Sequence, residues 1–250
     1  MIMGRLVYCL PMDRITIPAL AEMKRQGRKI VAVVAWDTPM AQLAERAGVD
    51  LLSVGDSVGK NLWGQATENE VTVDEMLVVC KAVRRGAKRA IVSCDAPASA
   101  DAMSAAQRLV KEGGADMIKV HASPDVVRQL AKSGIAVFAE FHGQRPVAEL
   151  VDEAKRLEEA GAAMLDFRHS GPEAGAAVVK AVKIPVIGGL GGGPWLDGRV
   201  RMAHAAIGYG MSWLDSNAET YAHVASIAQA ALAAYAEDVR ASRQIRGQRG

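Results

Sequence analysis

The chain has 250 residues, half of them hydrophobic, and 30 lysines and arginines against 28 aspartates and glutamates give it a net charge of +2. A chain of this length can bury one large core, and the near-neutral charge leaves no long basic face for nucleic acid. No run reaches the roughly 18 apolar residues of a membrane span, and three scattered cysteines suggest neither a disulfide framework nor a zinc site. We therefore expect a cytoplasmic protein with no nucleic-acid or membrane partner, folded as a single domain over residues 1–250.

Strand-like and helix-like runs alternate along the chain with short connections. After a helix expected over 17–26, the sequence predicts eight strands, at 29–35, 51–54, 90–94, 117–120, 136–139, 163–167, 185–187 and 210–214. A capping box at Thr72-x-x-Glu75 begins one of the intervening helices, and glycines such as Gly48 and Gly161 end helices just before a strand. Repeated β-α units require a parallel sheet. Eight of them in this length predict an α/β fold, a closed (β/α)8 TIM barrel with an N-terminal capping helix.

Polar side chains follow three consecutive predicted strands at the point where each strand ends. The second strand runs into Asp56 and Ser57, the third into Asp95, and the fourth carries Lys119 and leads to His121. The carboxyl ends of parallel strands meet at one face of a barrel, and active sites lie at that face. The pattern therefore predicts a site there, with Asp56 as a candidate metal ligand. An acid in such a position also suits a helix cap or an Asx-turn, and a lysine suits an ordinary ion pair.

These residues form part of a pattern that extends over almost the whole chain. Its pieces are Ile15-Thr16-Ile17-Pro18, Ala35-Trp36-Asp37, Val54-Gly55-Asp56-Ser57-Val58-Gly59, Gly114-Ala115-Asp116-Met117-Ile118-Lys119 and Ile184-Pro185-Val186-Ile187-Gly188. In them the chain resembles the ketopantoate hydroxymethyltransferase family of the phosphoenolpyruvate mutase and isocitrate lyase superfamily. The resemblance implies a pantothenate-pathway type of enzyme that works as a homo-oligomer. In that family the enolate of a small 2-oxo acid attacks the methylene group of methylenetetrahydrofolate.

Carried over residue by residue, the resemblance implies a divalent metal, normally Mg²⁺, held by Asp56 and Asp95. Ser57 and Lys119 are then expected to bind the 2-oxo acid. Chelation of the keto oxygen would stabilise the enolate that forms when the neighbouring carbon loses a proton. Trp63 lies in the connection that covers the active site in the family. It is expected either to cap the substrate or the pterin, or to make an oligomer contact.

Two positions depart from the family pattern. His121 stands where the family has a metal-proximal glutamate, and Arg168 stands where it has the glutamate that acts as base. Glu140 is the first candidate to replace that base because it ends a barrel strand just before the loop over the mouth, and His121 is the second. Arg168 suits a carboxylate or phosphate of a substrate that ordinary members do not bind. Further titratable groups near the same mouth are Asp166, His142 and His169, and each histidine suits a structural role equally well.

The expected function is Mg²⁺-dependent enolate chemistry on a small 2-oxo acid, as hydroxymethyl transfer or its retro-aldol reverse. The enzyme is expected either to catalyse the reaction of the family it resembles or to be a divergent paralogue with an altered substrate. Two alternatives stay open. One is a lyase of the wider superfamily that cleaves a C–C or C–P bond, although the Lys-Lys-Cys-Gly-His signature of those lyases is absent. The other is a non-catalytic barrel that binds a 2-oxo acid, which the retained acids and Lys119 disfavour. An alanine-rich helix at 218–239 is expected to pack on the barrel or on a second copy.

Overall fold

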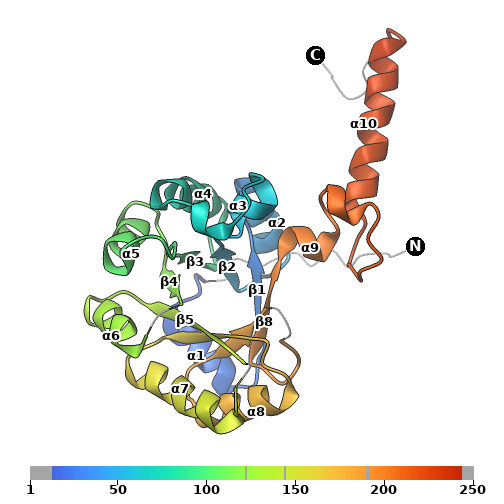
Figure 1. Ribbon diagram of the computed structural model, residues 1–250. Helices are drawn as coiled ribbons and strands as arrows, with labels where there is room; N and C mark the ends of the chain where they lie inside the picture. The colour runs from blue at the N-terminus through green and yellow to red at the C-terminus, as the bar shows by residue number, and fades with distance from the viewer. Residues whose placement is uncertain (1–12, 122, 144, 190–191, 244–250) are drawn as a thin grey trace. The chain divides into compact units, whose positions relative to one another are not determined.

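The computed structural model describes residues 13–121, 123–143, 145–189 and 192–243. Eight parallel strands form a closed barrel in chain order (Figure 1). They are β1 (Ile30–Val34), β2 (Leu51–Val54), β3 (Ile91–Asp95), β4 (Met117–Val120), β5 (Val137–His142), β6 (Met164–Arg168), β7 (Val186–Gly188) and β8 (Gly198–Met202). The predicted (β/α)8 barrel is confirmed. The chain divides into two compact units, Met1–Arg201 and Met202–Gly250, and a single domain over residues 1–250 stays a prediction.

The helices of the first unit precede or follow the strands in the expected alternation. They are α1 (Ile17–Arg25), α2 (Thr38–Arg46), α3 (Val58–Leu62), the 3-10 helix η1 (Glu68–Glu70), α4 (Val73–Gly86), α5 (Ala102–Lys111), α6 (Pro124–Lys132), α7 (Val147–Glu159) and α8 (Pro172–Ala181). The predicted capping box begins α4, because the Thr72 hydroxyl accepts from the Glu75 amide while the Glu75 carboxylate accepts from the Thr72 amide. Local sequence therefore sets where this helix starts.

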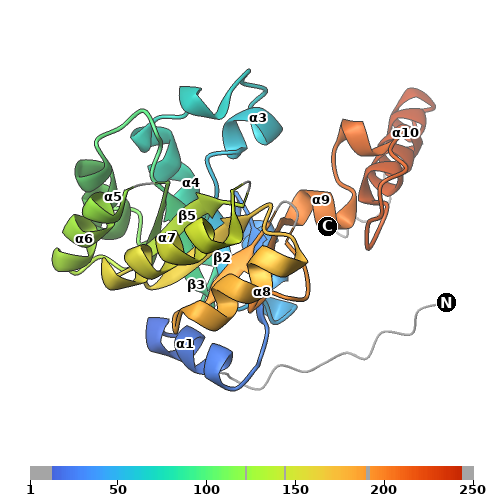
Figure 2. The same cartoon turned by 60° about the horizontal axis from the view of Figure 1, so that its bottom comes forward.

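Apolar side chains from seven strands fill one end of the barrel. They are Ile30, Leu51, Ile91, Met117, Phe138, Met164 and Ile187, and they form one buried cluster. Leu20 and Met23 of α1 belong to the same cluster, so this helix closes the apolar end of the barrel. Figure 2 shows α1 at one end of the barrel and α3 at the other. The predicted N-terminal capping helix is confirmed.

The barrel interior becomes polar toward the carboxyl ends of the strands. Successive side chains on a strand point to opposite faces, so residues two and four positions after a core residue face the same interior. Counted from Ile91, Met117, Phe138 and Met164, these residues are Ser93, Asp95, Lys119, Glu140, His142, Asp166 and Arg168. The strand alternation thus delivers acids and bases to the end of the barrel opposite α1.

The eighth strand differs from the prediction. It runs from Gly198 to Met202, and the predicted range 210–214 contains instead the 3-10 helix η2 (Met211–Trp213). Asp197 fixes the true start, because its carboxylate accepts from the Val186 amide at 2.9 Å and pairs with Lys24 at 2.9 Å. The strand reads Gly-Arg-Val-Arg-Met, so its polar alternation hides it from a search for apolar runs.

Gly198 lies where β8 closes against β1. A Cβ at this position would lie 2.1 Å from the carbonyl oxygen of Ile30, a backbone atom that cannot move aside as a side chain can. We expect Gly198→Ala to lower the free energy of unfolding by about 1–3 kcal/mol or more, the usual cost of overpacking. Denaturant unfolding measures this. Gly189→Ala is the matched control, since its Cβ would meet the Val200 carbonyl oxygen only at 3.3 Å. Equal stability of the two variants would contradict the close approach.

The second unit contains α9 (Ala203–Ile207), η2 and α10 (Val224–Arg240). Gly208 ends α9 with a left-handed φ of 65°, and the Tyr221 amide then donates to the Ala206 carbonyl oxygen at 2.8 Å. The predicted alanine-rich helix is present but begins at Val224. Among the described residues, no helix has the length and apolar character needed to cross a membrane.

Candidate active site

Lys119 is the centre of an ion-pair cluster built from four adjacent strands. Its Nζ lies 2.8 Å from Glu140 Oε2, 3.0 Å from Asp166 Oδ2 and 3.6 Å from Asp95 Oδ2. Strand register explains the meeting, because Asp95 pairs with Lys119 across β3 and β4 while Glu140 pairs with Asp166 across β5 and β6. Burial lowers the pKa of Lys119, but the three carboxylates more than offset this and raise it well above its usual value. The ammonium group therefore keeps its charge at neutral pH.

Asp56 and Asp95 place further negative charge beside this cluster. Asp56 directly follows β2, and Asp95 ends β3 with only 9% of its surface exposed. Burial, opposed by Lys119 and reinforced by Asp56, raises the pKa of Asp95 to about 7. Burial and the Glu68 carboxylate raise the pKa of Asp56 as well. Burial and neighbouring carboxylates thus disfavour the charged forms of both acids, and Lys119 offsets this only in part.

This arrangement fits a hard divalent cation. Asp95 Oδ1 and Asp166 Oδ1 are buried and have no hydrogen-bond partner among the described residues. Buried polar atoms are nearly always satisfied, so two such oxygens at one strand-end layer indicate a ligand site. Mg²⁺ prefers carboxylate oxygens and commonly binds through one or two of them while it keeps several waters. Asp95, one of the predicted pair, therefore offers a suitable donor in suitable surroundings.

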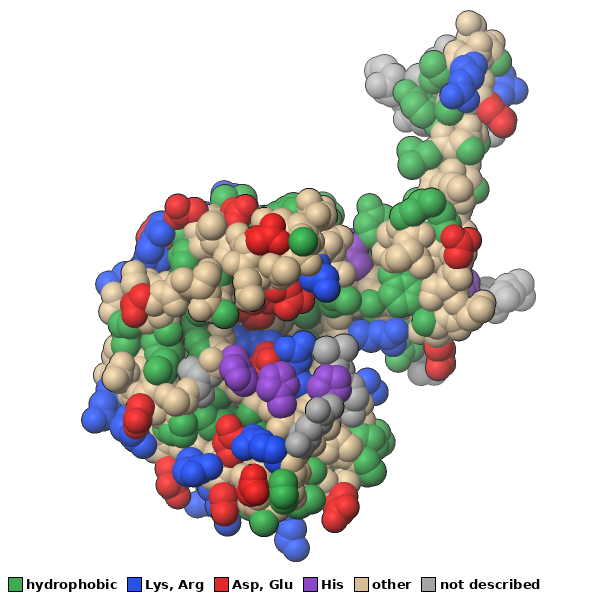
Figure 3. All heavy atoms as spheres, viewed as in Figure 1, with side chains coloured by type: hydrophobic (Ala, Val, Ile, Leu, Met, Phe, Trp, Pro, Cys, Tyr) green, Lys and Arg blue, Asp and Glu red, His purple; other side chains and the backbone are tan. Residues whose placement is uncertain are grey.

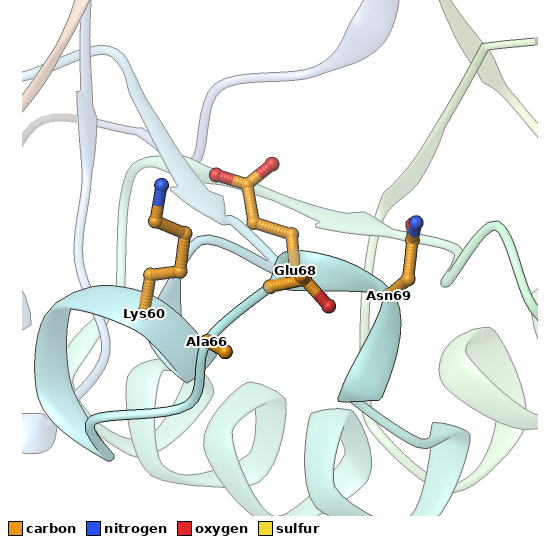
Figure 4. Close-up of a pocket in the computed structure, with 5 residues that line it drawn as sticks. Lys60, Ala66, Glu68 and Asn69 are labelled. Atoms are coloured by element: carbon orange, nitrogen blue, oxygen red, sulfur yellow. The ribbon is translucent and has the colours of Figure 1, made fainter.

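The connection after β2 lies close to these acids. A Cβ on Gly55 would lie 3.0 Å from the Ser57 hydroxyl and 3.8 Å from Asp95 Oδ2, so glycine lets the chain bring Ser57 beside Asp95. Figure 4 shows Lys60 and Glu68 extending from α3 and η1 toward the same side of an open hollow, which Ala66, Thr67 and Asn69 also line. Trp63, at the end of α3, is 39% exposed.

Glu140 is held between two cations. Arg168 Nη1 donates to Oε1 at 2.8 Å, and Lys119 lies 2.8 Å from Oε2. Burial acts to raise the pKa of Glu140, but the two cations outweigh it and lower the pKa to about 2. A carboxylate with so low a pKa is a weak proton acceptor near neutral pH. The geometry therefore disfavours the role of base that the sequence predicts for Glu140, and that role stays a prediction.

Three histidines lie at the ends of β4, β5 and β6. His121 follows β4, His142 ends β5, and His169 follows β6 with a φ of 54°, which is uncommon for a residue with a side chain. The carbonyl oxygen of His169 would lie 2.5 Å from a Cβ on Gly143, so the close approach of these two backbone segments requires glycine at position 143. In the space-filling view, histidine side chains gather beside acidic and basic ones on the hollowed face of this unit (Figure 3).

The model of the family described as ketopantoate hydroxymethyltransferase matches residues 14–146 and 141–244 of the chain. The chain belongs to this family. The 3-methyl-2-oxobutanoate hydroxymethyltransferase of Geobacillus kaustophilus is 36% identical, with 87% of each chain covered. The protein of the same name from Carboxydothermus hydrogenoformans is 33% identical, with 92% of each chain covered. Membership of ketopantoate hydroxymethyltransferase, a family of enzymes, was the prediction from the sequence and is confirmed.

Several solved structures share the fold. A 2,3-dimethylmalate lyase, described as a PEP mutase/isocitrate lyase superfamily member, superposes with a TM-score of 0.63 at 15% identity, covering 94% of this chain and 91% of its own. A phosphonopyruvate hydrolase in complex with oxalate and Mg²⁺ superposes with a TM-score of 0.62 at 16% identity, covering 92% and 89%. At these identities the likeness shows the barrel architecture of this ketopantoate hydroxymethyltransferase family member and no more.

The structure gathers most of the predicted site residues and adds one. Those near one another at the barrel mouth are Ser57, Asp95, Lys119, His121, Glu140 and Arg168. Asp56 directly precedes Ser57 in the chain after β2. Asp166, which the sequence indicates only as a further titratable group near the mouth, lies 3.0 Å from Lys119 Nζ through Oδ2. The sequence feature that indicates this position is the spacing of Met164, Asp166 and Arg168 at every second residue of one strand, which places all three side chains on the same face.

Mg²⁺ binding should depend on pH through Asp95. Proton and cation compete for a carboxylate whose pKa is about 7 in the fold, so we expect the affinity to fall about tenfold per pH unit below that value and to level off above it. The unfolded chain ionises this acid near its ordinary pKa of 3.8, so the metal-free protein should lose stability as pH rises between the two values. Calorimetric titration from about pH 5 to about pH 8 measures the affinity. A flat profile would contradict the raised pKa.

Proposed function

We propose that the protein catalyses enolate chemistry on a small 2-oxo acid, with hydroxymethyl transfer to its carbon as the reaction. The observation that supports this best is the buried layer of acids around a charged lysine, with two carboxylate oxygens that lack a partner among the described residues. Relatives with more than 30% identity are named for hydroxymethyl transfer to 3-methyl-2-oxobutanoate. An excess of buried carboxylates suits a cation together with an anionic substrate.

In this proposal Asp56 and Asp95 hold Mg²⁺, which supplies Lewis acidity at the keto oxygen when it is bound. Lys119 keeps its positive charge although it is nearly buried, so it can bind the substrate carboxylate. Ser57, in the connection after β2, offers a hydroxyl donor beside Asp95. Trp63 lies on the connection near the mouth, where it would shield the substrate from water. Methylenetetrahydrofolate as one-carbon donor rests on family membership alone.

We assign the proton-accepting role to Asp166 in preference to Glu140 or His121. Asp166 is 2% exposed and uses one carboxylate oxygen for Lys119, while the other has no partner among the residues described. Both oxygens of Glu140 are already occupied by cations. Arg168 is 30% exposed through its side chain, so it can bind an anionic group of the substrate beyond the carboxylate at Lys119.

We further propose that the protein is a cytoplasmic homo-oligomer. Ile227, Leu232 and Tyr235 of α10 are 66%, 67% and 53% exposed, and apolar side chains along a helix need a cover that a second copy would provide. Cys80 and Cys94 are both free thiols, as a reducing compartment favours. Sedimentation of the protein as a monomer at micromolar concentration would end the oligomer proposal.

Proton exchange of candidate substrates tests the enolate chemistry. The purified protein is incubated in D₂O with Mg²⁺ and a panel of 2-oxo acids that includes 3-methyl-2-oxobutanoate, and NMR follows the proton on the carbon next to the carbonyl. Loss of that signal only with both protein and Mg²⁺ supports enolisation. Product analysis with formaldehyde or methylenetetrahydrofolate then separates transfer from cleavage of the acid. Absence of exchange over the whole panel would favour a non-catalytic barrel.

A further inference from the structure

Strands β4 and β5 bring two imidazoles and a carboxylate together at the barrel mouth. Val120 pairs with Ala139 in the parallel register of β4 and β5, so the next residues along the two strands, His121 and Glu140, lie side by side. His142 lies two residues after Glu140 and therefore shares its face of β5. The ligand atoms of His121, Glu140 and His142 all lie within 4.8 Å of one another. Backbone register, and not a chance meeting of long side chains, sets this grouping.

We propose that His121, Glu140 and His142 bind a divalent transition-metal ion. The imidazole rings of the two histidines are 5.0 Å apart between centroids and tilted by 49°, so neither stacks flat on the other. Glu140 Oε1 lies 3.7 Å from His142 Nε2, which is too long for a hydrogen bond. Two ligand atoms of a tetrahedral ion at about 2.0–2.1 Å stand about 3.3 Å apart, so small side-chain rotations suffice to enclose one.

The donor types select the class of ion. Two histidine nitrogens with one carboxylate form the ligand set of catalytic zinc sites and of non-haem iron sites, whereas Mg²⁺ prefers oxygen ligands alone. Both histidines are exposed and Glu140 is partly buried, so the site has an entry path and keeps positions for water. Partial burial lowers the pKa of His142 more than the Glu140 carboxylate raises it.

This site is distinct from the acid pair. Lys119 stands between them, 3.6 Å from Asp95 on one side and 2.8 Å from Glu140 on the other. Lys119 and Arg168 both reduce the attraction of the site for a cation, yet each uses only part of the lone-pair capacity of the Glu140 carboxylate. They also fix its orientation and keep it ionised, since its pKa is about 2. The Glu140 carboxylate is thus ionised and already oriented for binding, although the two neighbouring cations lower its affinity for a metal ion.

Metal titration of the full-length, tag-free protein tests the site without any substrate. The metal-free chain is titrated with Co²⁺, whose visible absorption reports nitrogen ligation, and Zn²⁺ is then added as competitor. With excess Mg²⁺ present to fill the acid pair, we expect one Co²⁺ per chain, displaced by Zn²⁺. His121→Ala and His142→Ala should each weaken binding at least about tenfold, because each removes a direct ligand. Circular dichroism checks that these exposed substitutions leave the fold unchanged.

His169→Ala is the matched control, since it removes the third histidine of the mouth but not a member of the cluster. Its Co²⁺ affinity should equal that of the parent, and so should that of Asp125→Asn, whose side chain is 81% exposed on α6. Unaltered Co²⁺ binding in the double variant His121→Ala, His142→Ala would overturn the proposal, as would an equal loss in His169→Ala. Because no turnover is measured, failure of the deuterium exchange would leave this result standing.

Discussion

Asp95→Asn should abolish the Mg²⁺-dependent deuterium exchange of the 2-oxo acid while the barrel stays folded. The substitution keeps the shape of the side chain but removes the charged oxygens that a hard cation requires. We expect the Mg²⁺ affinity to fall by about 100-fold or more, with the exchange rate falling in proportion. Asp56→Ala should behave in the same way, because it removes the other acid of the pair.

Stability separates loss of a ligand from loss of the fold. Burial disfavours the charged form of Asp95, so an uncharged asparagine should leave the metal-free protein at least as stable above pH 7 as the parent. Denaturant unfolding measures this, and calorimetry measures Mg²⁺ binding. Asp125→Asn is the charge control, since that side chain is 81% exposed on α6. Unchanged Mg²⁺ affinity in both Asp95→Asn and Asp56→Ala would refute the metal assignment.

Acids at the two ends of the strands have different roles, and the sequence distinguishes them by position. Asp50 precedes β2 and pairs with Arg28, while Asp116 precedes β4 and pairs with Arg84. Asp56 and Asp95 come at or after the strand ends, and neither forms an ion pair with an arginine in the part of the chain that the structure describes. Because the carboxyl ends of barrel strands carry active sites, this difference alone predicts which acids hold the scaffold and which belong to the site.

Sequence patterns were sufficient for the strands with apolar runs and insufficient for β8. That strand is polar at alternate positions, and ion pairing of Asp197 with Lys24, far away in the sequence, determines where it starts. The same limit applies to Glu140. Its position at a strand end is readable from the sequence, but its pKa depends on Lys119 and Arg168, which only the closed barrel brings together. Local sequence patterns therefore do not predict a pKa that depends on charged residues from distant segments of the chain.

Asp166→Asn and Glu140→Gln should separate the two candidate bases. Each keeps the size and hydrogen-bonding capacity of its side chain and removes its basicity. If Asp166 accepts the proton, Asp166→Asn should lower the exchange rate by about 10²- to 10⁴-fold, the usual contribution of a general base. Substrate binding should change far less, because loss of the base acts on the transition state. Glu140→Gln should cost less than about tenfold, since two cations already suppress its basicity.

Exchange measured by NMR under saturating Mg²⁺ and substrate gives the rate, and the dependence on substrate concentration gives binding. The reverse ranking, with exchange lost in Glu140→Gln and kept in Asp166→Asn, would return the role of base to Glu140. That result would mean that the bound substrate draws Lys119 and Arg168 away from Glu140 and so raises its pKa. Arg168→Gln distinguishes the two cases: it should free one oxygen of Glu140 and speed exchange if Glu140 is the base, and only weaken binding of an anionic substrate if Asp166 is.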